Sequence, residues 1–226
     1  MLLLVTNTSG KQGSVAIARA GECDPHEVEV IEVAPLEGGA FSAQLVSQIA
    51  ALLARHRFSK ADIDAFIVVS GPGSFTGLRV GLAAIKALAE ILKKPIVAVS
   101  LLEVVAVASR AQGKVAAALD AGRGDVYFGG YGITRDTVQV LQEQLLSKAE
   151  FLSAAGGFTI ITPDPNWAAI SREAGLKVLA VETASPEMIT RLGWKKLQAG
   201  ETVSPEQLEA NYMRRSDAEM FVKSSS

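Results

Sequence analysis

The chain has few of the residues that usually carry chemistry. It holds one cysteine, Cys23, and two histidines, His26 and His56, among 226 residues. A single cysteine excludes a disulfide within the chain and a zinc site built from cysteines. The two histidines lie far apart in the sequence, so they do not form the His-Glu-x-x-His pattern of a metalloprotease. One unpaired thiol is typical of a protein in the reducing cytoplasm.

Long hydrophobic runs and an excess of positive charge are also missing. Hydrophobic residues make up 49% of the chain, but no uninterrupted run reaches the roughly 18 residues that a membrane span needs. Met1 to Val5 lacks the basic region and the length of a signal peptide, and it predicts a first strand. The formal net charge of −2 favours a soluble protein that meets nucleic acid only through a partner.

The most informative stretch of the sequence runs from Phe66 to Val99. Its first part, Phe66 to Val69, is a short β-branched run that predicts a buried strand ending in a glycine-rich loop. Ser74 is placed to cap a helix that ends at Leu92. Ile96 to Val99 predicts the next strand, so the stretch forms a right-handed β-loop-α-β unit of a parallel sheet.

The glycine-rich loop allows two interpretations. A loop of this kind before a helix offers outward-pointing amides to an anion. However, the spacing of Gly71, Gly73 and Gly77 is not the dinucleotide fingerprint, and no Lys-Ser/Thr pair follows as in a P-loop. The alternative is a tight turn with close packing. Gly77 and Gly81 favour a close approach, because each costs about 1 kcal/mol relative to alanine inside a helix.

The order of predicted elements indicates an α/β protein. Leu2 to Val5, Ser14 to Arg19 and Val28 to Val33 predict an antiparallel meander before a helix from Phe41 to Arg57, as in a ribonuclease H-like half. A helix from Leu101 to Ala111 leads out of this half. A second half is predicted from strands at 114–119, 125–131, 137–141, 159–162 and 176–181, and from helices capped by Ser147 and Ser185.

Residues Gly71 to Gly81, GPGSFTGLRVG, resemble the signature of the bacterial TsaB (YeaZ) family of tRNA threonylcarbamoyladenosine biosynthesis proteins. Similar segments recur at Thr6 to Ser9, Asp120 to Tyr127 and Tyr212 to Arg214. The resemblance implies the ASKHA fold of actin and Hsp70, with two α/β halves of mixed sheets. The expected halves are residues 1–110, which carry the glycine motif, and residues 111–226.

The resemblance also implies a function without catalysis. The protein would pair with a TsaD-like transferase and work with a TsaE-like ATPase to form N6-threonylcarbamoyladenosine (t6A) at tRNA position 37. It would contact tRNA only through that complex, would have no cofactor of its own, and would leave ATP and Mg²⁺ to the assembled complex. A homodimer without the partner stays possible. The alternative function is a weak ATPase of the actin-like superfamily that acts alone.

Three residues could carry chemistry in that alternative. Active members of the fold usually have a carboxylate at the end of the first strand, where it holds Mg²⁺. The chain has Asn7 there, a weaker ligand that can instead hydrogen-bond its own turn. Asp120 and Asp125 flank a glycine turn, where acids are also ordinary turn formers. The sequence therefore predicts no ATP hydrolysis.

A partner surface is predicted on the two helices of the first half. Both have more low-charge surface than one sheet can cover, and the second helix has an apolar arc of roughly 200°. Leu82 is expected at the edge of this arc, accessible in the monomer. The predicted interface residues are Leu45, Gln48, Ile49, Gly77, Leu78, Arg79, Gly81, Leu82 and Lys86.

Overall fold

The computed structural model describes residues 1–21, 27–135 and 137–213. The sequence-based expectations for Cys23, His26 and the terminal serines fall outside these ranges. Among the described residues, no helix combines the length and the apolar character needed to cross a membrane. Two compact units are present: Met1–Leu101 with Ser185–Asn211, and Leu102–Ala184 with Tyr212 and Met213.

The first unit is built on a five-stranded mixed sheet in the order β3-β2-β1-β4-β5. The first three strands form the predicted antiparallel meander, and the last two run parallel to β1. Strand β4 is completely buried, as its β-branched sequence predicts. The strands are β1 (Leu2–Asn7), β2 (Gln12–Ala20), β3 (Val28–Glu37), β4 (Ala65–Gly71) and β5 (Ile96–Ser100).

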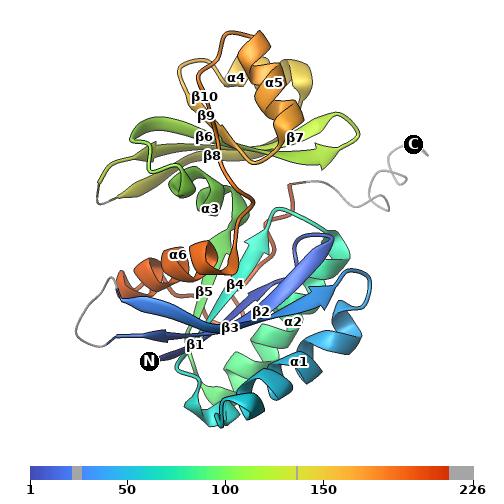
Figure 1. Ribbon diagram of the computed structural model, residues 1–226, viewed down its shortest axis with the longest axis vertical. Coiled ribbons are helices and arrows are strands. Elements are labelled where there is room, and N and C mark those ends of the chain that lie inside the picture. The colour runs from blue at the N-terminus through green and yellow to red at the C-terminus, as the bar shows by residue number, and fades with distance from the viewer. Residues whose placement is uncertain (22–26, 136, 214–226) are drawn as a thin grey trace. The chain divides into compact units, whose positions relative to one another are not determined.

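Helices cover both faces of this sheet (Figure 1). Helices α1 (Phe41–Arg55) and α2 (Phe75–Leu92) lie on one face and also pack against each other, while α6 (Pro186–Gln198) lies on the other. Gly193 of α6 is so close to the sheet that a Cβ there would stand 2.4 Å from Ile67. The short 3-10 helix η1 (Lys60–Asp62) precedes β4.

The second unit repeats this arrangement. Its sheet has the order β10-β9-β6-β7-β8, again with an antiparallel meander followed by parallel strands. Helices α4 and α5 pack on one face and α3 on the other, which gives two separate hydrophobic clusters. The elements are α3 (Leu101–Ala108), β6 (Gly113–Gly122), β7 (Asp125–Ile133), β8 (Val138–Ser147), α4 (Lys148–Ala154), β9 (Thr159–Thr162), α5 (Pro165–Glu173) and β10 (Val178–Ala180).

The units do not divide at the single boundary between residues 110 and 111 that the sequence suggested. The chain leaves the first unit after Leu101 and returns to it at Ser185. The reason is that α3, which follows β5, packs in the second unit, whereas α6, which follows β10, packs in the first. Sequence order assigns each helix to the preceding half, but burial of its apolar face decides where it packs.

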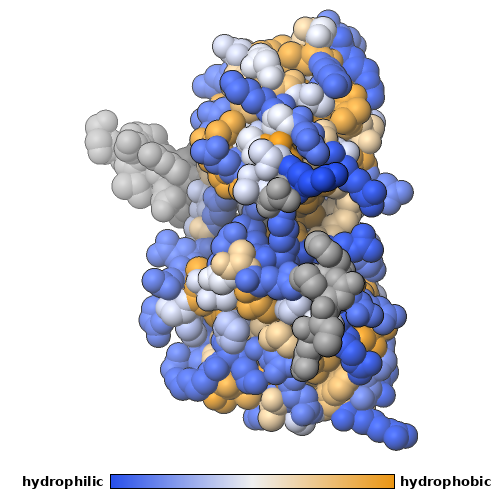
Figure 2. All heavy atoms as spheres, turned by 90° about the vertical axis from the view of Figure 1, so that its left-hand side faces the viewer, coloured by the Kyte–Doolittle hydropathy of each residue, from blue (hydrophilic) through white to orange (hydrophobic). Residues whose placement is uncertain are grey.

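Several element ends also differ from the expectations. Helix α1 stops at Arg55, and Arg57 has a φ of 58°, which ends the helix two residues early. Strand β8 continues to Ser147 instead of ending at Leu141. The predicted caps are confirmed at Ser74, Ser147 and Ser185, whose side chains accept hydrogen bonds from amides three residues ahead. On the face that Figure 2 shows, hydrophilic and hydrophobic residues are interspersed in both units.

Candidate functional site: the glycine loop and the helix pair behind it

The glycine loop lies between β4 and α2 and packs against the turn after β1. The Ser74 amide donates to the Ser9 carbonyl at 2.7 Å, and the Ser74 hydroxyl accepts from the Gly77 amide at 3.3 Å. Two of the amides that an anion could use at this helix N-terminus are thus bonded to the chain itself. The hydrogen bonds fix the loop to the turn.

Close packing explains the glycines inside α2. A Cβ at Gly77 would stand 2.1 Å from the Thr8 carbonyl oxygen and 3.1 Å from the Phe41 ring. A Cβ at Gly81 would stand 2.2 Å from the Thr8 hydroxyl. Both distances are shorter than any real carbon contact. The tight-packing interpretation of the motif is therefore confirmed at these two positions, where the strand-end turn sits directly on the helix backbone.

Asn7 is a turn residue. Its side-chain oxygen accepts hydrogen bonds from the Ser9 amide at 3.0 Å and from the Ser9 hydroxyl at 2.7 Å. This geometry is the local side-chain-to-backbone bonding that asparagine commonly makes in turns. The structure confirms the turn interpretation, and it gives the Asn7 oxygen a role in holding the turn against α2.

The acidic pair around the second glycine turn is also structural in character. Asp120 is exposed and accepts a hydrogen bond of 3.3 Å from the indole nitrogen of Trp167, while Asp125 begins β7 across the turn. Within the ranges that the structure describes, no three His, Cys, Asp or Glu side chains are grouped so that they could hold a metal ion.

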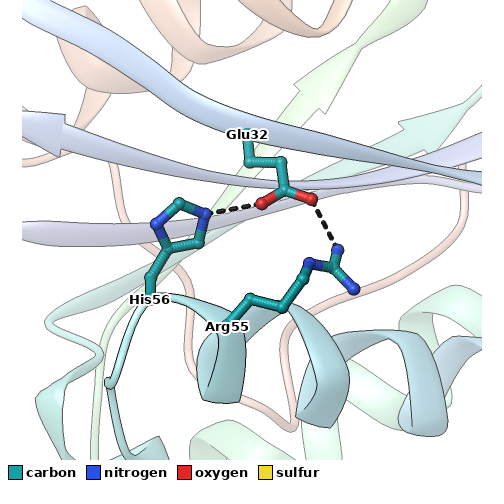
Figure 3. Close-up of polar contacts among 3 residues, drawn as sticks. All are labelled: Glu32, Arg55 and His56. Carbon is teal, nitrogen blue, oxygen red and sulfur yellow. Dashed lines mark hydrogen bonds and ion pairs between the residues drawn. The ribbon is translucent and has the colours of Figure 1, made fainter.

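A charged cluster that the sequence did not reveal joins β3 to the end of α1 (Figure 3). Glu32 lies between Arg55, at 2.6 Å, and His56 Nε2, at 2.5 Å. The hydrogen bonds from Arg55 and then His56 hold the pKa of the Glu32 carboxyl below its usual range. His56 stands directly after the last helical residue, as predicted.

This cluster predicts a pH-dependent contribution to stability. Because the Glu32 pKa is lower in the folded chain, its stabilisation is present above the ordinary glutamate pKa of about 4.3 and is lost as pH falls through the lowered value. Glu32→Gln should lower the melting temperature at pH 7 by a few degrees at most, since the pairs are partly exposed. That difference from wild type should vanish near pH 3.

The control is Glu29→Gln, which removes the same charge from an exposed position on the same strand. It should leave the melting temperature nearly unchanged at both pH values. Equal losses at pH 7 and pH 3 for Glu32→Gln would show that the cluster acts through packing rather than ionisation.

The predicted interface residues differ sharply in exposure. Six of the nine, at positions 45, 49, 77, 78, 81 and 82, are buried in the first unit. Gln48 and Lys86 are half-buried, and Arg79 is exposed with its guanidinium carbon 3.8 Å from the centre of the Phe75 ring. The expectation that Leu82 is accessible is wrong, because only 5% of its surface is exposed.

The reason lies in the contact between the two helices. The wide apolar arc of α2 covers the sheet on one side and meets α1 on the other, so both of its neighbours belong to this chain. Val80, Ala84 and Leu88 of α2 pack partly buried against this core. An arc width counted from sequence does not distinguish a neighbour within the chain from a partner.

A second, exposed set of residues on the same helices has little charge. On α1 it faces away from the core, and on α2 it lies beside the stripe that holds Arg79 and Glu90. We call it the low-charge face; Val46 and Ile91 are its largest members, with exposed fractions of 61% and 70%. It consists of Ala43, Val46, Ser47, Ala50, Ala54, Ala83, Ala87 and Ile91.

The fold defines a class of protein. Each unit has the element order β-β-β-α-β-α-β, a mixed sheet with the same strand order, and helices on both faces. This is the duplicated α/β architecture of the ASKHA class, as predicted. An uncharacterized protein with similarity to peptidase YEAZ from Pseudomonas aeruginosa has the same fold, with a TM-score of 0.73, 24% sequence identity, and coverage of 94% of this chain and 99% of that one.

The family follows from the sequence comparisons. A family model described as "TsaD: tRNA N6-adenosine threonylcarbamoyltransferase" matches residues 36–199, and the chain belongs to this family. The tRNA threonylcarbamoyladenosine biosynthesis protein TsaB of Escherichia coli is 28% identical over 230 residues, which cover 96% of each chain. TsaB of Bacillus subtilis is 40% identical over 93 residues, which cover 40% of this chain and 41% of the relative. These matches confirm the resemblance to TsaB (YeaZ).

Proposed function

We propose that this protein acts in tRNA threonylcarbamoyladenosine biosynthesis as a non-catalytic subunit that pairs with a TsaD-type transferase. The observation that carries the proposal is the similarity to E. coli TsaB over 96% of both chains. The complete fold, and not one motif alone, is therefore shared with a protein named for this pathway. We place the protein in the cytoplasm, with a TsaE-type ATPase, ATP and Mg²⁺ in the assembled complex.

The geometry of the loop supports the non-catalytic part of the proposal. In a phosphate-binding loop, glycines let the ligand approach the backbone. Here the space above Gly77 and Gly81 is taken by Thr8, and the Asn7 oxygen is bonded to Ser9. A fold can keep its scaffold after its site has changed. The glycine motif then serves to hold α2 in place.

The low-charge face supports the pairing part. Solvated helix faces normally carry many Glu and Lys side chains, whereas the centres of protein interfaces are depleted of charge. The exposed side of α1 has no charged residue before Arg55. Alanine and serine at these positions also let a partner helix approach closely. We infer that the transferase contacts α1 and α2 through this face.

A reconstituted reaction tests the function. With a TsaD-type transferase, a TsaE-type ATPase, threonylcarbamoyl-adenylate and unmodified tRNA, we expect formation of threonylcarbamoyladenosine only when this protein is added. Alone, it should not retain tRNA at about 150 mM salt, because its net charge is −2. Nucleoside analysis and filter binding measure the two results. Full modification without this protein would remove its proposed role.

The same preparation separates this function from a weak ATPase that acts alone. The alternative requires ATP turnover that persists through repeated purification and disappears in Asn7→Ala. The loop contacts do not favour it, since the Ser74 and Gly77 amides bond to groups within the chain. Turnover that is absent from wild type, together with partner-dependent modification, would support the subunit role.

A further inference from the structure

Strand β8 forms one edge of the second sheet. It pairs with β7 on one side, and no strand among the described residues pairs with it on the other. The strand has ten residues and is therefore about 33 Å long. An edge strand of this length presents a row of backbone donors and acceptors that another strand can pair with.

The side chains of β8 do little to prevent such pairing. Its only charged residue is Glu143, which accepts a hydrogen bond from the hydroxyl of the buried Tyr131. Val140 and Leu141 are apolar, with exposed fractions of 53% and 45%. The remaining polar side chains are neutral, mainly the glutamines at positions 139, 142 and 144.

The equivalent edge of the first sheet is protected in the usual way. Strand β3 carries Glu29, Glu32 and Glu37, whose charges would repel an identical strand, and Pro35, which has no amide to donate. The other ends of the two sheets differ again: β5 is bridged by Val203, and β10 has only three residues. The contrast makes β8 the long, weakly protected edge of the described chain.

A bulge interrupts β8 but leaves a regular segment. The register with β7 shifts at Leu141, between the Gly130–Gln142 and Tyr131–Val140 pairs. From Gln142 to Ser147 the register is continuous. Bulges twist an edge and weaken pairing locally. The six residues after the bulge therefore form the ladder that another strand would extend.

We propose that β8 pairs in antiparallel orientation with β8 of a second copy of this chain. The occupant follows from complementarity: glutamine amides both donate and accept, so the strand matches itself without repulsion. A two-fold axis at Gln142 or Gln144 places no charge opposite a like charge. This contact joins two second units and uses no residue of the low-charge face, so it does not depend on the proposed pairing with a transferase.

Sedimentation of the full chain over a range of concentrations tests the proposal. Wild type should form a dimer, and the double variant Leu141→Lys, Gln144→Lys should raise its dissociation constant at least tenfold, because facing lysines repel across the two-fold axis. Circular dichroism and melting temperature should stay near those of wild type. The control is Val46→Glu on α1, which should leave the dimer intact.

Hydrogen exchange gives a second readout that needs no variant. Amides of residues 139–147 should become more protected as the wild-type concentration rises through the dissociation constant. A wild-type chain that stays monomeric, or a dimer whose β8 amides gain no protection, would overturn the proposal. So would a dimer that Val46→Glu abolishes and the double lysine variant leaves intact.

Discussion

Replacing Gly77 by alanine is expected to destabilise the chain by about 2 kcal/mol or more, the range of an overpacked core. The result runs against helix propensity, by which alanine is better than glycine by about 1 kcal/mol. The added Cβ would stand 2.1 Å from the Thr8 carbonyl, a backbone atom that cannot rotate away. The melting temperature should fall by roughly 4–8 °C, measured by circular dichroism.

Two matched variants give the comparison. At Gly81 the nearest atom is the Thr8 hydroxyl, a side-chain group that can turn aside, so Gly81→Ala should cost less than Gly77→Ala. Gly156→Ala adds a Cβ whose nearest neighbour is 3.9 Å away and should leave stability almost unchanged. If Gly77→Ala melts at or above the wild-type temperature, the close approach of Thr8 does not explain the motif.

A carboxylate on the low-charge face is expected to weaken binding to the transferase at least a hundredfold. Val46→Glu and Ala83→Glu each add a charge at an exposed position, so the free monomer should fold normally. In the complex, the charge would be buried without a partner, which costs several kcal/mol, and each 1.4 kcal/mol is a factor of ten in affinity. Isothermal titration calorimetry with the purified transferase measures the loss.

Leu82→Asp should abolish binding for a different reason. Leu82 lies in the core with 5% of its surface exposed, so the variant should lose the circular dichroism of the folded first unit. Ala149→Glu makes the same substitution as Ala83→Glu at an exposed helical position in the second unit and should bind like wild type. Wild-type affinity in both Val46→Glu and Ala83→Glu would exclude this face as the interface.

The local features of this protein could be predicted from its sequence. The caps at Ser74, Ser147 and Ser185 were correct, because a cap depends on a hydroxyl and on amides within the next three residues. The antiparallel meander, the β-loop-α-β unit and the turn role of Asn7 were correct for the same reason. The family could be recognised because its glycine motif is long and continuous in the sequence.

Exposure on the helix pair was decided by the tertiary structure. Periodicity gave the apolar arc of α2, but only packing showed that α1 and the sheet cover it and that Leu82 is buried. The glycine at position 77 indicated a close neighbour, yet Thr8, which provides it, lies 69 residues earlier. Contacts between residues so distant in sequence leave no local pattern, because either partner can be chosen independently.

The exchange of α3 and α6 between the units, and the length of β8, were likewise decided by the complete fold. A helix with an apolar face can be buried on either of two similar sheets, and its sequence does not say which. The bulge at Leu141 breaks the two-residue alternation that marks a strand, so the pattern ended there while the pairing with β7 continued to Ser147. The sequence by itself determined the elements, their caps and the family, because these depend on neighbouring residues. The tertiary structure decided which faces are exposed and which edges are open, because these depend on what distant segments cover.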